Sequence, residues 1–183
     1  MLMSDDGYWE MCAANPEVRF EREPSGEIII LPPSGFETSY RNSDLTAQLT
    51  VWAKHDKRGV AIGSSTEFFL SNGAARSPNA CWILITRLSA FTKEEKGKFL
   101  HLCPDFIVEL KSPSDRLAQQ KAKMQEWMDN GAQLGWLIDA DKRTAYVYRR
   151  GKAPEELINI ESLAGEGPVE GFVLALGAIW KGL

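Results

Sequence analysis

The chain has 183 residues, of which 44% are hydrophobic and 25% are charged, a composition typical of a globular protein with one sizeable core. We therefore expect a single domain over residues 1–183, without repeats or linkers. The net charge of −4 gives no general attraction for nucleic acid, so binding of DNA or RNA would require a local basic face.

The cysteine and histidine content argues against two common kinds of stabilised domain. The three cysteines, Cys12, Cys81 and Cys103, form no C-x-x-C pair, and there are only two histidines. This pattern speaks against a disulfide framework or a zinc site and suits a reducing compartment. No apolar run approaches the ~20 residues that span a bilayer, and no signal peptide is visible. We therefore expect a cytoplasmic protein without a membrane partner.

The predicted elements mix strands and helices along the whole chain. In chain order, helices are predicted at residues 4–14, 37–57, 92–99 and 115–130, and strands at residues 18–23, 27–31, 60–63, 67–70, 80–86, 105–111, 134–139, 143–149 and 157–160. A Gly-rich loop at 165–167 and an apolar segment at 172–180 complete the chain. This order predicts an α/β (α+β) fold, with a mixed sheet flanked by two main helices.

Local signals support several of these elements. Pro24-Ser25-Gly26 separates the first two strands and predicts an N-terminal hairpin. In the long helix at 37–57, Leu45, Leu49 and Trp52 recur at i, i+4 and i+7, which makes a stripe that faces the core. Thr92 followed three residues later by Glu95 forms a capping box, which favours a short charged helix there.

The segment 104–115 is the most informative stretch of the sequence. Phe106, Val108 and Leu110 fall on one face of a predicted strand, while Glu109 and Lys111 fall on the other. Charged side chains rarely enter a central strand without a partner or a metal ion. The same alternation also suits an edge strand whose solvated face carries a surface Glu–Lys pair. The pattern alone leaves both interpretations open.

Several familiar catalytic motifs are missing. The sequence has no phosphate loop of the form G-x-x-x-x-G-K-[ST], no G-x-S-x-G elbow and no H-E-x-x-H. What remains is Glu109-x-Lys111 on a strand, and Pro78-Asn79 at the start of an earlier strand. These two patterns are therefore the candidates for a chemical function.

The two patterns together resemble the signature of the PD-(D/E)XK nuclease superfamily. The flanking sequence is similar to the Uma-type restriction endonuclease family within it, and the similarity covers nearly the whole chain. It runs through residues 45–52, 64–70, 104–115, 123–139 and 171–174. This resemblance implies a restriction-endonuclease-like core, hydrolysis of DNA phosphodiester bonds with a divalent metal ion, and often a homodimer.

The resemblance also implies roles for individual residues. Glu109 corresponds to a metal ligand, and the carbonyl group of Leu110 could offer a further oxygen. Mg²⁺, or Mn²⁺ in its place, takes such hard oxygen ligands together with phosphate oxygens of the substrate. Lys111 would stabilise charge in the transition state or orient the attacking water.

Residue 79 departs from the family pattern, which has an acidic residue after the proline. Asn79 retains a carbonyl oxygen but removes one negative charge from the ligand set. Asp105 does not replace this charge, because it lies four residues before Glu109 on the same strand, about 13 Å away. Glu67 is a better candidate for compensation, since its strand could neighbour that of Asn79.

Two further residues are candidates for accessory roles. Glu37 opens the first long helix, which sometimes donates an acid in such nucleases. Lys123, two turns into the second long helix, could contact DNA phosphates or simply belong to a solvated helix face. Two functions remain open. Retention of Glu109 and Lys111 favours a metal-dependent DNA endonuclease. Asn79 in place of the usual acid favours a catalytically inactive module for nucleic-acid binding or dimerisation.

Overall fold

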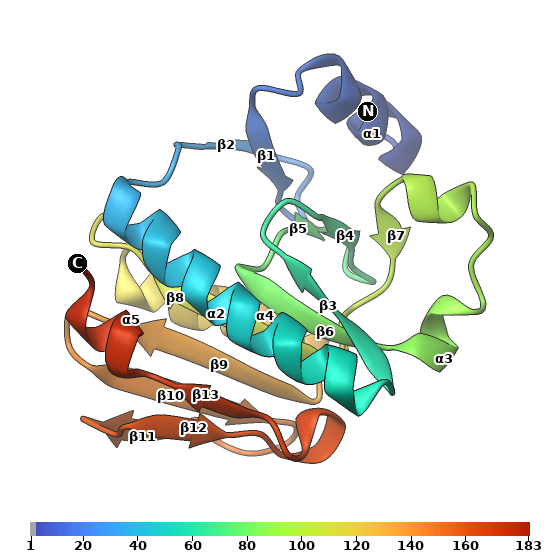
Figure 1. Cartoon of the computed structure of the whole chain (residues 1–183). Helices are drawn as coiled ribbons and strands as arrows, with labels where there is room; N and C mark the ends of the chain where they lie inside the picture. The colour runs from blue at the N-terminus through green and yellow to red at the C-terminus, as the bar shows by residue number, and fades with distance from the viewer. Residues whose placement is uncertain (1–2) are drawn as a thin grey trace.

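The computed structural model describes residues 3–183, and its centre is a mixed sheet of six strands (Figure 1). The six strands are β3 (Gly59–Gly63), β6 (Ala80–Leu84), β8 (Phe106–Lys111), β9 (Leu134–Asp139), β10 (Thr144–Arg149) and β11 (Glu155–Ile158). They lie in the order β11-β10-β9-β8-β6-β3. The β8–β9 pair is parallel and the other pairs are antiparallel. The mixed α/β fold predicted from the sequence is therefore confirmed.

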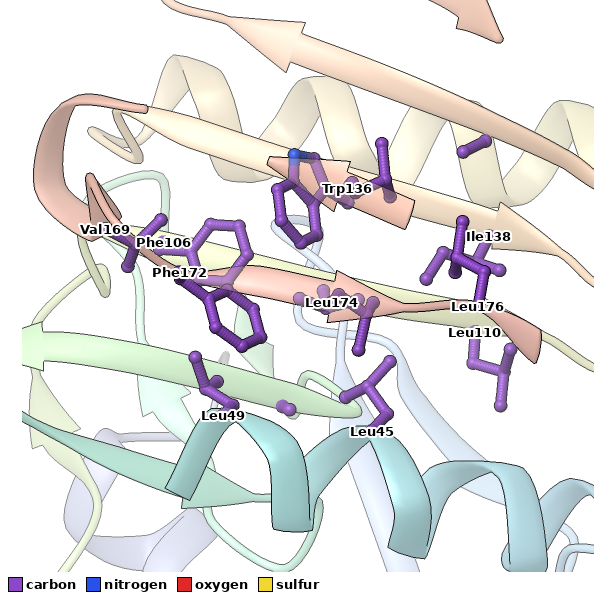
Figure 2. Close-up of a cluster of buried hydrophobic side chains, with 14 of the residues drawn as sticks. Leu45, Leu49, Phe106, Leu110, Trp136, Ile138, Val169, Phe172, Leu174 and Leu176 are labelled. Atoms are coloured by element: carbon purple, nitrogen blue, oxygen red, sulfur yellow. The ribbon is translucent and has the colours of Figure 1, made fainter. Parts of the chain in front are cut away.

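The two long helices cover opposite faces of this sheet. Helix α2 (Phe36–Asp56) packs Leu45 and Leu49 against the face that carries Phe106, as Figure 2 shows. Helix α4 (Leu117–Asp129) packs Met124, Trp127 and Met128 against the other face. This division follows from the pleat of β8, because alternate side chains of one strand point to opposite faces.

The C-terminal segment closes the core on the α2 side. Strands β12 (Ser162–Ala164) and β13 (Val173–Ala175) form an antiparallel pair, and α5 (Gly177–Lys181) follows. Phe172 stacks on Trp136 with ring centroids 5.7 Å apart (Figure 2). The apolar segment predicted at 172–180 thus belongs to the core, and the Gly-rich loop before it contains only the 3₁₀ turn η2 (Gly167–Val169).

A second, smaller mixed sheet lies beside the first (Figure 1). Its strands are β1 (Arg19–Arg22), β2 (Ile28–Leu31), β4 (Phe68–Phe69), β5 (Ala75–Arg76) and β7 (Leu100–His101), in the order β2-β1-β5-β4-β7. The β1–β2 pair is the predicted N-terminal hairpin. Helix α1 (Asp5–Ala14) precedes it, and the side chain of Ser4 accepts a hydrogen bond from the backbone of Gly7 at 3.1 Å, as expected for an N-cap.

Several predictions of the elements are wrong. The strand predicted at 157–160 lies at Glu155–Ile158, and β5, β7, β12 and β13 are not predicted from the sequence. Three further differences have a local reason. Residues 92–99 contain only a 3₁₀ turn, η1 (Glu95–Gly97), although the predicted capping box is present. The turn has no buried side chain, so no tertiary packing stabilises a longer helix there. The strand predicted at 80–86 ends at Leu84, where the short helix α3 (Ile85–Leu88) begins. Helix α4 begins at Leu117 rather than at residue 115, since Asp115 accepts a hydrogen bond from the Ser112 backbone and closes the preceding turn.

Strand β8 lies inside the central sheet and not at its edge. It pairs with β6 through Ala80 opposite Val108, and with β9 on its other side. The edge-strand interpretation of the 104–115 segment is therefore excluded, and Glu109 is buried. Asp105, just before β8, accepts hydrogen bonds from the Leu84 backbone at 2.9 Å and from Gln133 at 2.9 Å. Its role is structural, as its distance from Glu109 along the strand predicts.

None of the helices in the described part of the chain combines the length and the apolar character that crossing a membrane requires.

Candidate active site

A cleft of about 460 Å³ opens where β6 begins and β8 ends, between the first turn of α2 and the N-terminal half of α4. Asn79, Glu109, Leu110 and Lys123 line it together. Asn79 immediately precedes β6, Glu109 and Leu110 lie on β8, and these two strands are hydrogen-bonded neighbours. The antiparallel pairing of β6 and β8 therefore brings the two motifs to one place.

Asn79 lies immediately before β6 and reaches across to β8. Its Oδ1 accepts a hydrogen bond from the backbone N–H of Leu110 at 2.9 Å, which extends the ladder between the two strands by one contact. A carbonyl oxygen has two lone pairs, so this bond leaves one acceptor position free for another ligand. The side chain is thus fixed at the cleft by the backbone of the E-x-K motif itself.

Glu109 is the buried carboxylate of the cleft, with 3% of its surface exposed. Its Oε1 accepts a hydrogen bond from the Trp127 indole at 2.9 Å and lies 3.1 Å from the Lys123 ammonium. Burial raises the pKa of Glu109 above its usual value, although Lys123 favours the charged form. A cationic partner therefore stabilises the ionised form of Glu109.

Lys123 provides the cation nearest to Glu109. Its Nζ donates to Glu21 Oε1 at 2.8 Å and to the Ser77 carbonyl at 3.0 Å, in addition to the contact with Glu109. Burial lowers the pKa of Lys123, but the carboxylates of Glu109 and Glu21 outweigh burial and raise it. Lys123 is consequently charged at neutral pH and not part of a solvated helix face.

Glu21 is a member of this cluster that the sequence-based site does not include. It comes from β1, is 5% exposed, and accepts a hydrogen bond from the Ser77 backbone at 3.1 Å. Burial is the largest single effect and raises the pKa of Glu21, but Lys123, the Ser77 N–H and Arg76 together outweigh it, so the pKa is lowered overall. Glu21 pairs with Ile29 across the hairpin, and its place on a strand does not distinguish it in the sequence from a solvent-exposed acid.

Lys111 is not among the residues that line the cleft. Its Nζ donates to the carbonyl of Ser112 at 3.1 Å and lies 4.0 Å from Asp139 Oδ2. Asp139 is the direct neighbour of Lys111 in the parallel β8–β9 pair. The structure thus brings Asn79, Glu109 and Leu110 together and adds Lys123, whereas Lys111 is directed to a buried carboxylate on the next strand.

The two accessory acids are placed differently. Glu37 lines the cleft from the first turn of α2, where it pairs with Arg41 at 3.0 Å and is half exposed. Glu67 lies just before β4 in the smaller sheet and accepts a hydrogen bond from the Tyr8 hydroxyl at 2.9 Å. It is not among the lining residues, so it does not take the place of an acid at position 79.

The burial of Glu67 gives a prediction about pH. Burial is the main cause that raises the pKa of Glu67 from 4.5 to about 7. Because the folded pKa lies above the unfolded one, the stabilising effect is complete below pH 4.5 and is lost as the pH rises through 7. Glu67→Gln keeps an acceptor for Tyr8 and should remove this dependence. From pH 5 to pH 8 the free energy of unfolding of the native protein should fall by roughly 3 kcal/mol more than that of the variant. Urea titration at each pH measures both free energies. Parallel pH profiles would contradict the assignment.

The donors of the cleft are suited to a hard divalent cation. The carboxylate of Glu109, the amide oxygen of Asn79 and the carbonyl of Leu110 are oxygen ligands of the kind that Mg²⁺ and Mn²⁺ take, and the cleft presents no thiol or imidazole. Within residues 3–183 there is no group of three acidic, histidine or cysteine side chains placed around one ion. These three donors therefore match a hard divalent cation in chemical type, but of the three only Glu109 carries a negative charge.

Comparison with known proteins identifies the fold and the family of the chain. The crystal structure of a "putative nuclease belonging to DUF820" from Anabaena variabilis ATCC 29413 is similar, with a TM-score of 0.75 and 21% sequence identity over 90% of each chain. At this identity the similarity shows the fold alone. No curated protein matches the chain. The model of the Uma2 family, described as "Putative restriction endonuclease", matches residues 5–177. The chain therefore belongs to the Uma2 family.

Proposed function

We propose that this protein is a divalent-metal-dependent endonuclease that hydrolyses DNA phosphodiester bonds, and that Asn79 weakens its metal site. Membership of the Uma2 family supports the reaction class. The observation that carries the proposal is the convergence of Asn79, Glu109 and Lys123 in one cleft, from three elements that are separate in the sequence. The likeness to a nuclease fold supports DNA as the substrate.

Each residue of the cleft has a distinct role in this proposal. Glu109, Asn79 and the Leu110 carbonyl would hold Mg²⁺ or Mn²⁺, and such an ion would supply Lewis-acid chemistry for the phosphate and for a water molecule. Lys123 stabilises the negative charge that develops on the phosphate oxygens, because it is the ammonium group that lies in the cleft. Lys111 supports β9 through Asp139 and takes no direct part.

A second function is favoured by a specific observation. The Lys123 ammonium lies between the carboxylates of Glu21 and Glu109, and Arg76 lies 3.4 Å from Glu21, so both acids have cationic partners without a metal ion. Acids that are already paired in this way suit a catalytically inactive module that binds nucleic acid or forms a homodimer. Under either function, a homodimer would present one cleft to each strand of DNA. Analytical ultracentrifugation, which measures the oligomeric state, tests the homodimer separately from the activity.

The proposed function is tested by nicking of supercoiled plasmid. The native protein is incubated with plasmid in Mg²⁺, in Mn²⁺ and in EDTA, and relaxed and linear products are separated on agarose. Slow nicking in Mn²⁺ or Mg²⁺ that EDTA abolishes is the expected result. Retention of plasmid in a gel-shift assay without nicking in either metal would favour the binding module.

Glu109→Gln should abolish metal binding while the fold persists. The amide keeps the shape of the side chain and an acceptor for the Trp127 indole, but it removes the buried negative charge. We expect the heat of Mn²⁺ binding in isothermal titration calorimetry to fall below detection. Glu37→Gln is the matched control at the cleft rim, because its half-exposed carboxylate pairs with Arg41 instead. Equal Mn²⁺ binding by the native protein and Glu109→Gln would exclude Glu109 as a ligand.

A further inference from the structure

Two side chains of α4 contact the same oxygen of Glu109. Lys123 and Trp127 are four residues apart, so they lie on one face of the helix. The Lys123 ammonium is 3.1 Å from Oε1, and the Trp127 indole N–H donates to Oε1 at 2.9 Å. Neither Lys123 nor Trp127 therefore contacts the other carboxylate oxygen of Glu109, Oε2.

The hydrogen bond from Trp127 is not a simple consequence of burial. Trp127 is 0% exposed and Trp82, on β6, is 1% exposed, yet the indole nitrogen of Trp82 has no hydrogen-bond partner among residues 3–183. The core of this protein thus accommodates a buried indole with an unpaired N–H. Trp127 instead directs its side-chain donor to Glu109, the buried carboxylate of the cleft.

We infer that Trp127 is a positioning residue for Glu109: its indole fixes Oε1 against α4 and so directs Oε2 toward the cation of the cleft. The inference rests on the proposed function, because it assigns the purpose of that orientation to metal binding. The Trp127 ring is immobilised in the core beside Met124 and Met128. A rigid donor of this kind fixes a carboxylate more firmly than a flexible side chain does, and hydrogen bonds to ligating carboxylates tune metal affinity.

The test compares two conservative substitutions of buried tryptophans. Trp127→Phe removes the indole N–H and its hydrogen bond to Glu109. Trp82→Phe removes the same atoms from the core but breaks no hydrogen bond, since that N–H has no partner among the described residues. Both variants should lose some thermal stability because each leaves a small cavity. Stability alone therefore does not distinguish positioning from packing.

Metal affinity distinguishes the two roles. By isothermal titration calorimetry with Mn²⁺, Trp127→Phe should bind at least about tenfold more weakly than the native protein, the usual cost of removing such a supporting hydrogen bond. Trp82→Phe should bind with the native affinity. Native Mn²⁺ affinity in Trp127→Phe, or an equal loss in both variants, would overturn the inference.

A second readout requires no metal. In ¹H–¹⁵N spectra the indole resonance of Trp127 is assigned by its loss in Trp127→Phe, and that of Trp82 by its loss in Trp82→Phe. Glu109→Gln should shift the Trp127 indole resonance, because its acceptor loses a charge, and leave the Trp82 resonance in place. If the native protein binds no Mn²⁺ but this shift occurs, the orientation of Glu109 by Trp127 stands and the metal-dependent function fails. An unmoved Trp127 resonance overturns the positioning role whatever the metal titration gives.

Discussion

Asn79→Asp should tighten Mg²⁺ binding by about tenfold or more and raise plasmid nicking by a similar factor. The substitution adds a full negative charge beside the cation where water is scarce. Two unit charges at 4 Å interact by about 4 kcal/mol at an effective dielectric constant of 20, and the open side of the cleft reduces this to a fraction. The fold should be retained, because an aspartate also accepts the hydrogen bond from the Leu110 backbone.

The same substitution should lower the stability of the metal-free protein. It brings a second carboxylate to the cleft beside Glu109, and like charges in one site disfavour each other's ionised form. Added Mg²⁺ should restore the melting temperature, as expected when a ligand binds only the folded state. The control is Asn79→Asp combined with Lys123→Met, which should bind metal but not nick. If Asn79→Asp changes neither the Mg²⁺ titration nor plasmid nicking, the inactive binding module is the better account.

Lys123→Met should destabilise the fold by about 3–5 kcal/mol above neutral pH and abolish nicking. The methionine fills much of the same space but leaves the buried carboxylates of Glu21 and Glu109 without their shared cation. Lys121→Met is the matched control on the same helix. Its ammonium lies 4.0 Å from the Tyr146 ring centroid, so its loss should cost about 1 kcal/mol. Unfolding in urea measures both values.

The loss caused by Lys123→Met should depend on pH with a definite sign. Burial already raises the pKa of Glu109, and removing the cation raises it further. A carboxyl whose folded pKa exceeds its unfolded pKa stabilises the protein at low pH, and that contribution disappears as the pH rises through the folded value. The difference between Lys123→Met and the native protein should therefore shrink toward pH 4.5 and grow toward pH 8. If nicking survives in Lys123→Met and is lost in Lys111→Met, the role inferred from the sequence for Lys111 is correct.

The sequence predicts most of the fold and half of the cleft. The strand period of 105–111 and the proline at Pro78 are local signals, and they place Asn79 beside Leu110 as soon as the two strands pair. The orientation of Lys111 is not a local property, because four rotatable bonds separate its ammonium from the backbone and the partner that attracts it, Asp139, lies on another strand. For the same reason a helical lysine such as Lys123 is indistinguishable in sequence from a solvated one until the helix is packed.

Glu21 illustrates a second limit of sequence patterns. Its hairpin is recognisable from Pro24-Ser25-Gly26, but only the docking of that hairpin against α4 brings the carboxylate to Lys123. Periodicity describes the face of a strand and not the neighbour that covers it. The residues 92–99 show the converse, since a correct capping box there does not produce a helix without an apolar face to bury.

The pairs that build the cleft differ greatly in the length of chain between them. Glu109 and Trp127 are 18 residues apart, whereas Lys123 and Glu21 are 102 apart. The entropic cost of closing a loop rises with its length, and folds rich in distant contacts form slowly. During refolding, the contact between β8 and α4 can therefore form early, while the full set of charges assembles only when the N-terminal hairpin docks. Metal affinity of the cleft is consequently a property of the finished tertiary structure, and its recovery marks the end of folding.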